Sequence, residues 1–506
     1  MIYSGTIEAK TGHLIPTYKS GKPAHSKYNP TGERLSIAED FFGCIIVFGI
    51  AGGFHIKNLL ANENIFKVIA VESDNESLDF CLSLETVKEL SKNERVALCT
   101  MENFCQCTKE NYIPSLHKKL STLFLRSWHD EVPDADARVN ELLNKCLDSI
   151  SADISVQAHF GKHWHINILS NLKHMSQSGF INTPVKIPEG KTKAAIIAAG
   201  PTLDNSIEQL KWEKECTYIV STDTAYGTLL NYHIVPDAVV SVDAQQVSSE
   251  HFLGITKCRT VFIFDISSNP ETVRTVSEKG NKIFFIRSNH PLANLIADKA
   301  AIPYTESGSG TVTIAAADWA RQQKFRQIEF FGADFAYSDG KPYCRGTYLE
   351  KKFYSSSGRI SSSEEKYSTL MFRTDLEKTE KGLLGKLGKS AFTNKILASY
   401  GSTLLQWASK HNLKQNGSVF TAISSPINSN TPTPSAFDFK AFISSYIEKV
   451  QSLADRMDEI SLSHIVKEIL GSRELISLLP LFAASGKETI TEDISLALQL
   501  LLYYNL

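Results

Sequence analysis

The stretch AAIIAAGPTLDNSI, residues 194–207, joins a short apolar run to a Gly-Pro turn and the start of a helical pattern. A buried strand followed by such a turn is a common setting for a phosphate, because the N-terminus of a helix favours an anion. Glycine lets the backbone approach a ligand, and proline suits the first helical position. The stretch matches neither the Walker pattern nor the dinucleotide glycine fingerprint. By itself it fits a phosphate site and a plain strand-to-helix turn equally well.

Similar apolar runs recur through the middle of the chain, from about residue 166 to 430. They are near-continuous rather than alternating, which is typical of strands covered on both faces and predicts a mostly parallel, doubly wound sheet. The predicted strands are residues 194–199, 217–222, 238–242, 260–265, 282–287 and 327–331. Small or polar residues stand at or just beyond their carboxyl ends, namely Gly200, Asp223, Asp243, Asp265, Ser288, Gly332 and Asp334. Ligands bind along that edge of a doubly wound sheet, so we expect the site there.

Two further motifs fall at the same edge. In ESGSGTVTIAAADWARQQ, residues 306–323, four small residues precede a helical pattern that begins near Thr311. Their amides and two hydroxyls form an anion cradle or a flexible loop; they are Ser307, Gly308, Ser309 and Gly310. In QIEFFGADFAYSDGKPYCRGTY, residues 327–348, a buried strand is followed by one aspartate and three tyrosines, which are Asp334, Tyr337, Tyr343 and Tyr348. Tyrosine hydroxyls can donate to a leaving phosphate, although ordinary packing is the alternative. The polar residues 351–366 that follow are predicted to be a lid or a disordered loop.

The regions on either side have different patterns. Residues 1–165 contain the outline of a Rossmann-like βαβ unit, in which Glu72 ends the second strand 23 residues after Gly49. The glycine pattern is only partly met, so this region is either a degenerate scaffold or a working site such as a methyltransferase's. His163 and His165 stand close enough to share a metal, or simply lead into a helix. We predict no metal site.

The last region, residues 431–506, follows a Ser/Pro/Asn/Thr-rich stretch read as a linker. Apolar residues then recur at steps of three and four, which predicts a helix packed inside a small helical domain. The stripe consists of Phe439, Phe442, Ile443, Tyr446, Ile447, Val450, Leu453 and Met457.

The composition narrows the class of protein. A chain of 506 residues suggests about two to four domains. The formal net charge of −2 gives no field for nucleic acid or an anionic membrane. The N-terminus lacks the apolar run of a signal peptide, and the longest apolar stretch is shorter than the ~18 residues that span a membrane. The nine cysteines follow no zinc spacing. We therefore expect a cytoplasmic protein.

Taken in order, these motifs resemble the motility accessory factor (Maf) flagellin glycosyltransferases, over about residues 40 to 430. The central domain of that family is similar to bacterial sialyltransferases that use CMP-sialic acid. In those enzymes a Gly-Pro-Ser-Leu turn contacts the nucleotide, and a Ser-Gly turn before a helix meets donor groups. An Asp-Phe-Tyr loop supplies tyrosines to the leaving phosphate. The matching positions here are Gly200, Pro201, Thr202 and Leu203, then Ser307, Gly308 and Ser309 (with Gly310 beside them), and then Asp334 and Phe335, with Tyr337 one place late and Tyr343 well placed.

The resemblance implies transfer of a nonulosonic acid, pseudaminic or legionaminic, from its CMP donor to Ser or Thr hydroxyls of flagellin, with no cofactor beyond the donor. Tyr337 and Tyr343 would serve the leaving group, and Asp223 and Asp243 would meet ribose, base or sugar hydroxyls. The sialyltransferases use a downstream histidine as general base, but no histidine lies between His290 and His411 here. The base is then Asp334, another carboxylate or no strong base.

Two other functions remain open. One is an inactive flagellin-binding accessory protein or chaperone, which the absent histidine favours. The other is a pterin diphosphokinase, an activity found in some archaeal relatives of the central domain.

Overall fold

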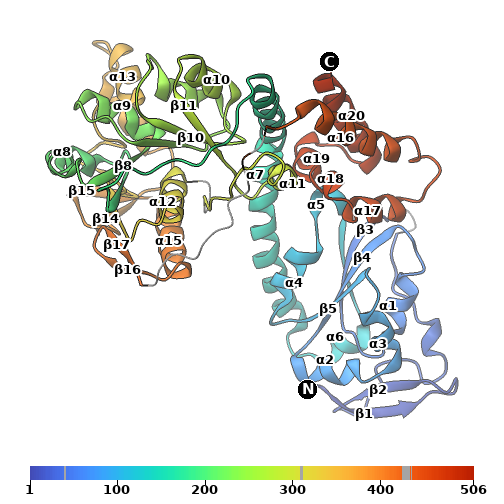
Figure 1. The fold of residues 1–506 in the computed structure, drawn as a ribbon. Helices are drawn as coiled ribbons and strands as arrows, with labels where there is room; N and C mark the ends of the chain where they lie inside the picture. Colours follow the sequence, from blue (N-terminus) through green and yellow to red (C-terminus); the bar gives the residue numbers. More distant parts are fainter. Residues whose placement is uncertain (39–40, 308–310, 424–433, 435, 506) are drawn as a thin grey trace. The chain divides into compact units, whose positions relative to one another are not determined.

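A computed structural model describes residues 1–38, 41–307, 311–423, 434 and 436–505 of the chain. The chain forms two compact units, Met1–Lys162 with Lys440–Leu506, and His163–Phe439 (Figure 1). The helical segment at the end of the chain thus belongs to the N-terminal unit, where we expected a third, separate domain. The reason is visible in its contacts: Lys118 Nζ forms an ion pair with Asp493 at 2.5 Å and donates to the Lys487 carbonyl at 3.1 Å.

The N-terminal unit contains a four-stranded parallel sheet in the order β5-β4-β3-β6. Its strands are β3 (Gly43–Phe48), β4 (Ile65–Glu72), β5 (Val96–Thr100) and β6 (Leu120–Phe124), and an antiparallel hairpin is formed by β1 (Tyr3–Glu8) and β2 (Leu14–Tyr18). Its helices are α1 (Phe54–Leu59), α2 (Asn75–Leu82), α3 (Glu85–Ser91), α4 (Phe104–Asn111), α5 (Pro114–His117), α6 (Arg126–Glu131), the first part of α7 (Ala135–Gln177) and the short turn η1 (Pro30–Gly32). This is the predicted Rossmann-like domain.

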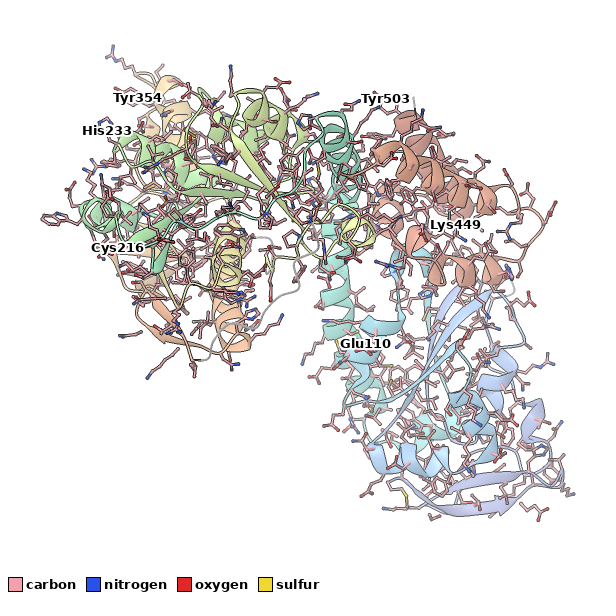
Figure 2. All side chains as sticks on the ribbon, viewed as in Figure 1. Glu110, Cys216, His233, Tyr354, Lys449 and Tyr503 are labelled. Atoms are coloured by element: carbon pink, nitrogen blue, oxygen red, sulfur yellow. The ribbon has the colours of Figure 1, made fainter. Side chains whose placement is uncertain are left out.

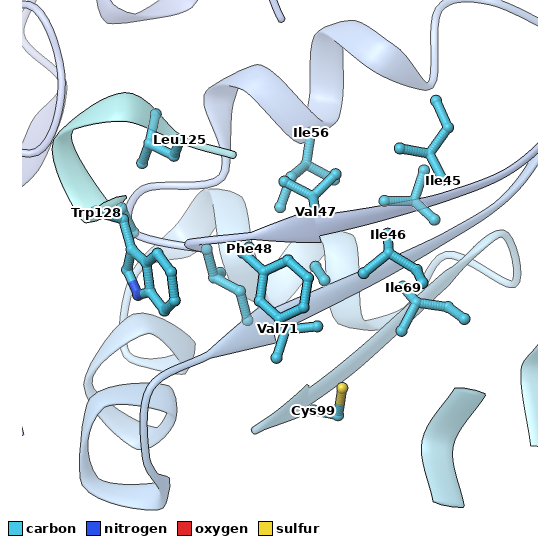
Figure 3. Close-up of a cluster of buried hydrophobic side chains, with 14 of the residues drawn as sticks. Ile45, Ile46, Val47, Phe48, Ile56, Ile69, Val71, Cys99, Leu125 and Trp128 are labelled. Carbon is cyan, nitrogen blue, oxygen red and sulfur yellow. The ribbon is translucent and has the colours of Figure 1, made fainter. Parts of the chain in front are cut away.

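The core of this unit explains the continuous apolar run of its first strand. Every residue of β3 is buried, because helices cover both faces of the sheet. Ile46 lies opposite Ile69 of β4, and Phe48 stacks with Phe124 at 5.4 Å between ring centroids. Figure 3 shows Phe48 and Trp128 side by side in this cluster. Burying each such side chain contributes about 1.5–3 kcal/mol.

The C-terminal helices have the predicted apolar stripe. They are α16 (Phe439–Ala454), α17 (Leu462–Leu470), α18 (Arg473–Ile476), α19 (Leu479–Ser485) and α20 (Ile490–Asn505). The stripe residues from Phe439 to Leu453 are buried, whereas Met457 lies beyond the end of α16 and is half-buried. Figure 2 shows the outer side chains of these helices, including Lys449 and Tyr503. Along the described chain, no helix combines the length and apolar character that a bilayer crossing requires.

The central unit contains an eight-stranded sheet in the order β11-β10-β9-β8-β7-β12-β17-β16. The first six strands of this order are parallel, and β17 and β16 are antiparallel at one edge. The parallel strands are β7 (Lys193–Ile197), β8 (Thr217–Thr222), β9 (Ala238–Ser241), β10 (Val261–Asp265), β11 (Lys282–Ile286) and β12 (Gln327–Phe331), and the edge strands are β16 (Leu413–Asn416) and β17 (Val419–Ala422). The chain runs outward from β7 to β11 and then returns to the other side of β7. The topological switch point therefore lies between β7 and β12.

Helices cover both faces of this sheet, as the doubly wound prediction requires. Ala194 and Ile196 of β7 pack with α12 and α15, and Ala195 and Ile197 pack with α8 and α9. The helices of this unit are α8 (Ile207–Glu213), α9 (Asp223–Asn231), α10 (Pro270–Glu278), α11 (Pro291–Ile296), α12 (Val312–Gln322), α13 (Tyr348–Ser355), α14 (Ser363–Met371) and α15 (Lys395–Lys410), with the 3-10 turns η2 (Pro201–Asn205) and η3 (Gln246–Phe252). A small antiparallel sheet is formed by β13 (Tyr337–Ser338), β14 (Glu377–Lys381) and β15 (Lys386–Thr393).

One local prediction differs from the structure, and the alternatives left open for one histidine pair can be decided. Residues 351–366 were expected to be a lid or a disordered loop, but most of them belong to α13 and α14. The Ser362 hydroxyl accepts a hydrogen bond from the Glu365 amide and so caps α14. The histidine pair lies within α7, where His163 is exposed and His165 is fully buried. Two residues apart on a helix they face different sides and cannot share a metal.

Candidate active site

The loops after β7 and β12 approach each other closely at the switch point, because each has a glycine where the two backbones meet. The Gly200 amide donates to the Gly332 carbonyl at 2.7 Å. A Cβ on Gly200 would lie 2.4 Å from that carbonyl oxygen, and one on Gly332 would lie 2.4 Å from the Ala198 oxygen. Gly332 also has a φ of +65°, which a side chain would strain. The predicted Gly-Pro turn is therefore fixed by backbone contact with the neighbouring strand's loop.

Asp334 connects the two loops. Its carboxylate accepts hydrogen bonds from the Thr202 amide at 2.8 Å and from the Thr202 hydroxyl. Burial raises the pKa of Asp334, while these two hydrogen bonds oppose the rise. The Thr202 donors that we expected to meet a nucleotide are thus directed at Asp334. Because Asp334 is bound to Thr202, we infer that Asp334 positions the Gly200 turn.

A cavity of about 230 Å³ opens beside this connection. It is bounded by the ends of β7, β8 and β12 and by the N-terminus of α12. The residues around it are Ala198, Ala199, Gly200, Thr222, Thr224, Thr311, Val312, Thr313, Gly332, Ala333, Asp334, Phe335, Ala336, Tyr337, Pro342, Tyr343, Leu397 and Tyr400. Because the amides at a helix N-terminus favour negative charge, this wall suits an anionic ligand.

The predicted small-residue turn leads into the same helix. Thr311 is the residue before α12, and its amide donates to the Ser307 carbonyl at 3.2 Å. Gly308, Ser309 and Gly310 lie outside the described residues.

Both predicted tyrosines line the cavity. Tyr337 lies on β13 opposite Phe392 of β15, and Tyr343 keeps 39% of its surface exposed although protein surrounds it, as a side chain in a concavity does. Burial raises the pKa of Tyr343 to about 12; Tyr348 and Tyr337 add to the rise, and Arg373 opposes it. The Tyr343 hydroxyl therefore stays protonated at neutral pH and can donate a hydrogen bond or a proton.

Four other predicted residues have different surroundings. Leu203 is fully buried in the core under α8 and does not reach the cavity, and Pro201 takes the first position of η2 as predicted. Asp223 accepts from the Ser241 hydroxyl at 2.7 Å and from the Thr224 amide at 2.7 Å. Asp243 accepts from the Gln245 amide at 2.8 Å, and burial raises the pKa of Asp243. Neither aspartate lines the cavity that contains the tyrosines.

The sequence analysis missed several residues of this cavity. Thr222 and Thr224 flank Asp223, so their place at the strand end was predictable from that neighbour. Tyr400 comes from a later segment that has no sequence pattern pointing to a ligand. The same is true of Arg373, which interacts electrostatically with Tyr343 but does not line the cavity. Among the described residues no three His, Cys, Asp or Glu side chains gather as a metal site would require.

Comparison with known proteins shows which families and folds this chain is similar to. Residues 166–340 match the family described as 6-hydroxymethylpterin diphosphokinase MptE-like. The solved structure of the MAf glycosyltransferase from Magnetospirillum magneticum AMB-1 has a similar fold, with a TM-score of 0.54 and 13% identity over 99% of this chain and 86% of that one.

Two uncharacterised proteins of Treponema pallidum (strain Nichols) are more similar in sequence. One is 38% identical over 140 residues, which are 27% of this chain and 48% of the relative, so the chain spans about half of its length. The other is 32% identical over 157 residues, which are 30% of this chain and 70% of the relative. The fold implied by the resemblance to Maf glycosyltransferases is confirmed. The chain belongs to the family of the second Treponema pallidum protein and has the fold of the MAf glycosyltransferase.

Proposed function

We propose that the protein is a glycosyltransferase that moves a nonulosonic acid, of pseudaminic or legionaminic type, from a CMP donor to Ser or Thr hydroxyls of flagellin. The observation that carries this proposal is the cavity at the switch point, where the α12 N-terminus and two tyrosines face one space. A CMP-linked keto sugar departs readily, so the enzyme mainly has to hold the donor and stabilise the departing phosphate. Flagellin and the CMP donor come from the family resemblance.

Most of the proposed roles follow from the positions around the cavity. The amides near Thr311 bind the phosphate or the sugar carboxylate, and the family resemblance assigns Ser307 to Gly310 to the same donor groups. Tyr343 donates to the leaving phosphate, Tyr337 assists it, and Arg373 adds positive charge near Tyr343. The Gly200 turn, held by Asp334, lets the nucleotide approach the backbone. All nine cysteines are free, which supports the cytoplasm as the place of the reaction.

Intact-mass analysis of flagellin from cells with and without this protein tests the proposal. We expect the flagellin from complete cells to be heavier by whole nonulosonic acid residues. Flagellin of equal mass in both would remove the function.

A second candidate is a pterin diphosphokinase, because residues 166–340 match a family of that description. Calorimetric titration with CMP, with ATP and Mg²⁺, and with a hydroxymethylpterin separates the two. CMP binding alone supports the glycosyltransferase, and joint binding of ATP and pterin supports the kinase. Binding of flagellin without any nucleotide would indicate an accessory protein instead.

A further inference from the structure

A second cavity, of about 540 Å³, lies in the N-terminal unit. Phe42, directly before β3, and Lys119, directly before β6, lie in its wall. The cavity therefore lies at the amino ends of these parallel strands, whereas Glu72 ends β4 at the opposite edge of the sheet. The rest of the wall comes from α5, from Ile154 of α7, from α19 and from the loop between α19 and α20. We call this space the lysine cavity.

Three lysines line this cavity, and one of them is neutralised by a buried carboxylate. Lys118 forms its ion pair with Asp493, which is 1% exposed. Lys119 and Lys487 are exposed, and within the described part of the chain neither has a carboxylate at ion-pair distance. Glu488 is the one acidic residue among the described residues of the wall. The wall therefore has an excess of positive charge, which an anion would balance.

The backbone at Lys118 has an uncommon conformation. Its φ is +59° and its ψ is −73°, and the Lys119 amide donates to the His117 carbonyl at 2.8 Å. This is the γ-turn with positive φ, which is rare and strained. Backbone strain of this kind concentrates at ligand sites. Here the turn brings two consecutive lysines to one space, with Lys118 bound to Asp493 and Lys119 available to a ligand.

Another part of the wall is apolar. Phe42, Ile154 and Ala483 are half-buried, so their side chains stay partly open to the cavity. The Lys119 ammonium lies 4.7 Å from the centre of the Phe42 ring. This cation–π contact puts positive charge and apolar surface side by side. A ligand that fits both parts of the wall joins an anionic group to an apolar body.

The N-terminus of α20 lies next to the cavity but does not supply the binding groups. Thr489 and Glu492 cap it together, because the Thr489 amide donates to the Glu492 carboxylate at 3.3 Å and the Glu492 amide donates to the Thr489 hydroxyl at 3.3 Å. Glu492 also interacts electrostatically with Lys487 and Lys118, but it does not line the cavity. The lysine ammonium groups, rather than backbone amides, are thus the groups that can meet an anion.

We propose that the lysine cavity binds a small organic anion, in which a phosphate, sulfonate or carboxylate group is joined to an apolar ring. Lys119 and Lys487 would contact the anionic group, and the ring would lie against Phe42 and Ile154. Because Lys119 precedes β6 and Lys487 follows α19, the ligand would join the parallel sheet to the C-terminal helices. This is a binding site of the N-terminal unit, and it does not depend on the function proposed for the central unit.

The test separates the two halves of such a ligand. 1-Naphthyl phosphate, 1-naphthol and inorganic phosphate are titrated by calorimetry into the full chain, with excess CMP present because the cavity of the central unit also suits a phosphate. The first probe joins a ring to a phosphate, and the other two supply each part alone. We expect 1-naphthyl phosphate to bind at least about 10-fold more tightly than either part, because the ring and the charge both contribute.

Charge variants assign this binding to the lysine cavity. Lys119→Gln and Lys487→Gln should each weaken it about fivefold, and the double variant about 25-fold. Glu488→Gln should strengthen it by about twofold to fivefold, because a negative charge leaves the wall. Lys10→Gln is the matched control and should change nothing. Lys10 is an exposed lysine of the same unit whose ammonium lies 4.5 Å from the centre of the Tyr28 ring, but it does not line the cavity.

Three results would overturn the proposal. They are no binding of 1-naphthyl phosphate, equal affinity in the wild type and the double lysine variant, and weaker binding in Glu488→Gln, which would mean that packing rather than charge governs the site. All the substituted side chains are exposed, so each variant should unfold at the same urea concentration as the wild type. Neither flagellin nor a sugar donor enters this experiment, so its failure leaves the proposed glycosyltransferase function untouched, and the reverse also holds.

Discussion

The two units carry the same kind of parallel sheet, but they differ at the edge where a ligand would bind. In the N-terminal unit, Glu72 at the end of β4 is fully buried. Its carboxylate accepts from Trp128 Nε1 at 2.7 Å, from the Tyr3 hydroxyl at 2.9 Å and from the Ser73 amide at 2.8 Å. In the central unit, the edge between β7 and β12 leaves a cavity of about 230 Å³ instead.

This difference distinguishes a sheet edge that is filled by side chains from one that keeps a cavity. An acidic residue in the position of Glu72 meets ribose hydroxyls in dinucleotide-binding folds, but here internal donors occupy both carboxylate oxygens. Trp128 packs against Phe48 in the same place (Figure 3). The scaffold alternative is therefore favoured for the N-terminal unit. The βαβ outline locates the edge where a site can form, and the side chains beyond the strands decide whether space remains.

We call the sheet edge at Glu72 the closed edge and the edge between β7 and β12 the open edge. Trp128→Ala tests the closed edge and should have the largest effect. Removing this fully buried side chain and its hydrogen bond to Glu72 should lower the free energy of unfolding by about 3–5 kcal/mol, measured by urea denaturation. CMP affinity should not change. Trp212→Ala, at a position 86% exposed, is the control and should alter neither. Loss of CMP binding in Trp128→Ala with stability kept would show that the N-terminal edge takes part in the site.

Tyr343→Phe tests the open edge. Loss of one donor to the leaving phosphate should lower the rate of sugar transfer by about 100-fold, or about 2.7 kcal/mol. Flagellin binding, measured by co-sedimentation or calorimetry, should stay as in the wild type. Tyr354→Phe removes a hydroxyl from a tyrosine 77% exposed on α13 (Figure 2) and should have no effect. Unchanged transfer in Tyr343→Phe would exclude this role.

The sequence predicts where the strands begin and end better than it predicts which loops beyond them touch. β8 and β12 begin and end at the predicted residues, because each has a short apolar centre and is followed directly by Asp223 or Gly332. Gly200, Tyr337 and Tyr343 were predicted from local patterns and do line the cavity. The Thr202–Asp334 contact was not predictable, because it joins two loops far apart in the chain.

The helices after the cavity were missed for a different reason. The serines of residues 351–366 suggested a loop, yet Thr347 and Ser362 each stand three residues before a glutamate, at Glu350 and Glu365. This is the capping-box spacing that begins a helix. Both threonine and serine hydroxyls accept from those glutamate amides.

Gly200→Ala tests how closely the two loops of the open edge must approach. The added Cβ would lie 2.4 Å from the Gly332 oxygen and 2.7 Å from the Asp334 carboxyl, so the loops must separate. We expect stability to fall by about 1–3 kcal/mol, with weaker CMP binding. Gly358→Ala meets nothing within 4 Å and is the control. A Gly200→Ala variant that is as stable as Gly358→Ala and binds CMP equally well would mean that the close approach has no role.

Asp334 should give the smallest effect, as a dependence of stability on pH. Burial raises the pKa of Asp334 above the ordinary value of 3.8, so the folded protein holds this proton more tightly than the unfolded chain does. The resulting stabilisation is complete below the ordinary pKa and is lost as pH rises through the raised value. The unfolding free energy of the wild type minus that of Asp334→Asn should therefore fall as pH rises over that range, by about 1.4 kcal/mol for each unit of pKa shift.

Urea denaturation of both forms from acidic to neutral pH measures this difference, and the Asn variant is its own control because it does not titrate there. A difference that grows with pH would reverse the sign. It would mean that the two hydrogen bonds from Thr202 outweigh burial and keep Asp334 ionised in the folded protein. Glu72 in the N-terminal unit and Asp334 in the central unit would then both be ionised and held by internal donors. The two edges would differ only in their free space, which Trp128 fills in the N-terminal unit and which Gly200 leaves open in the central unit.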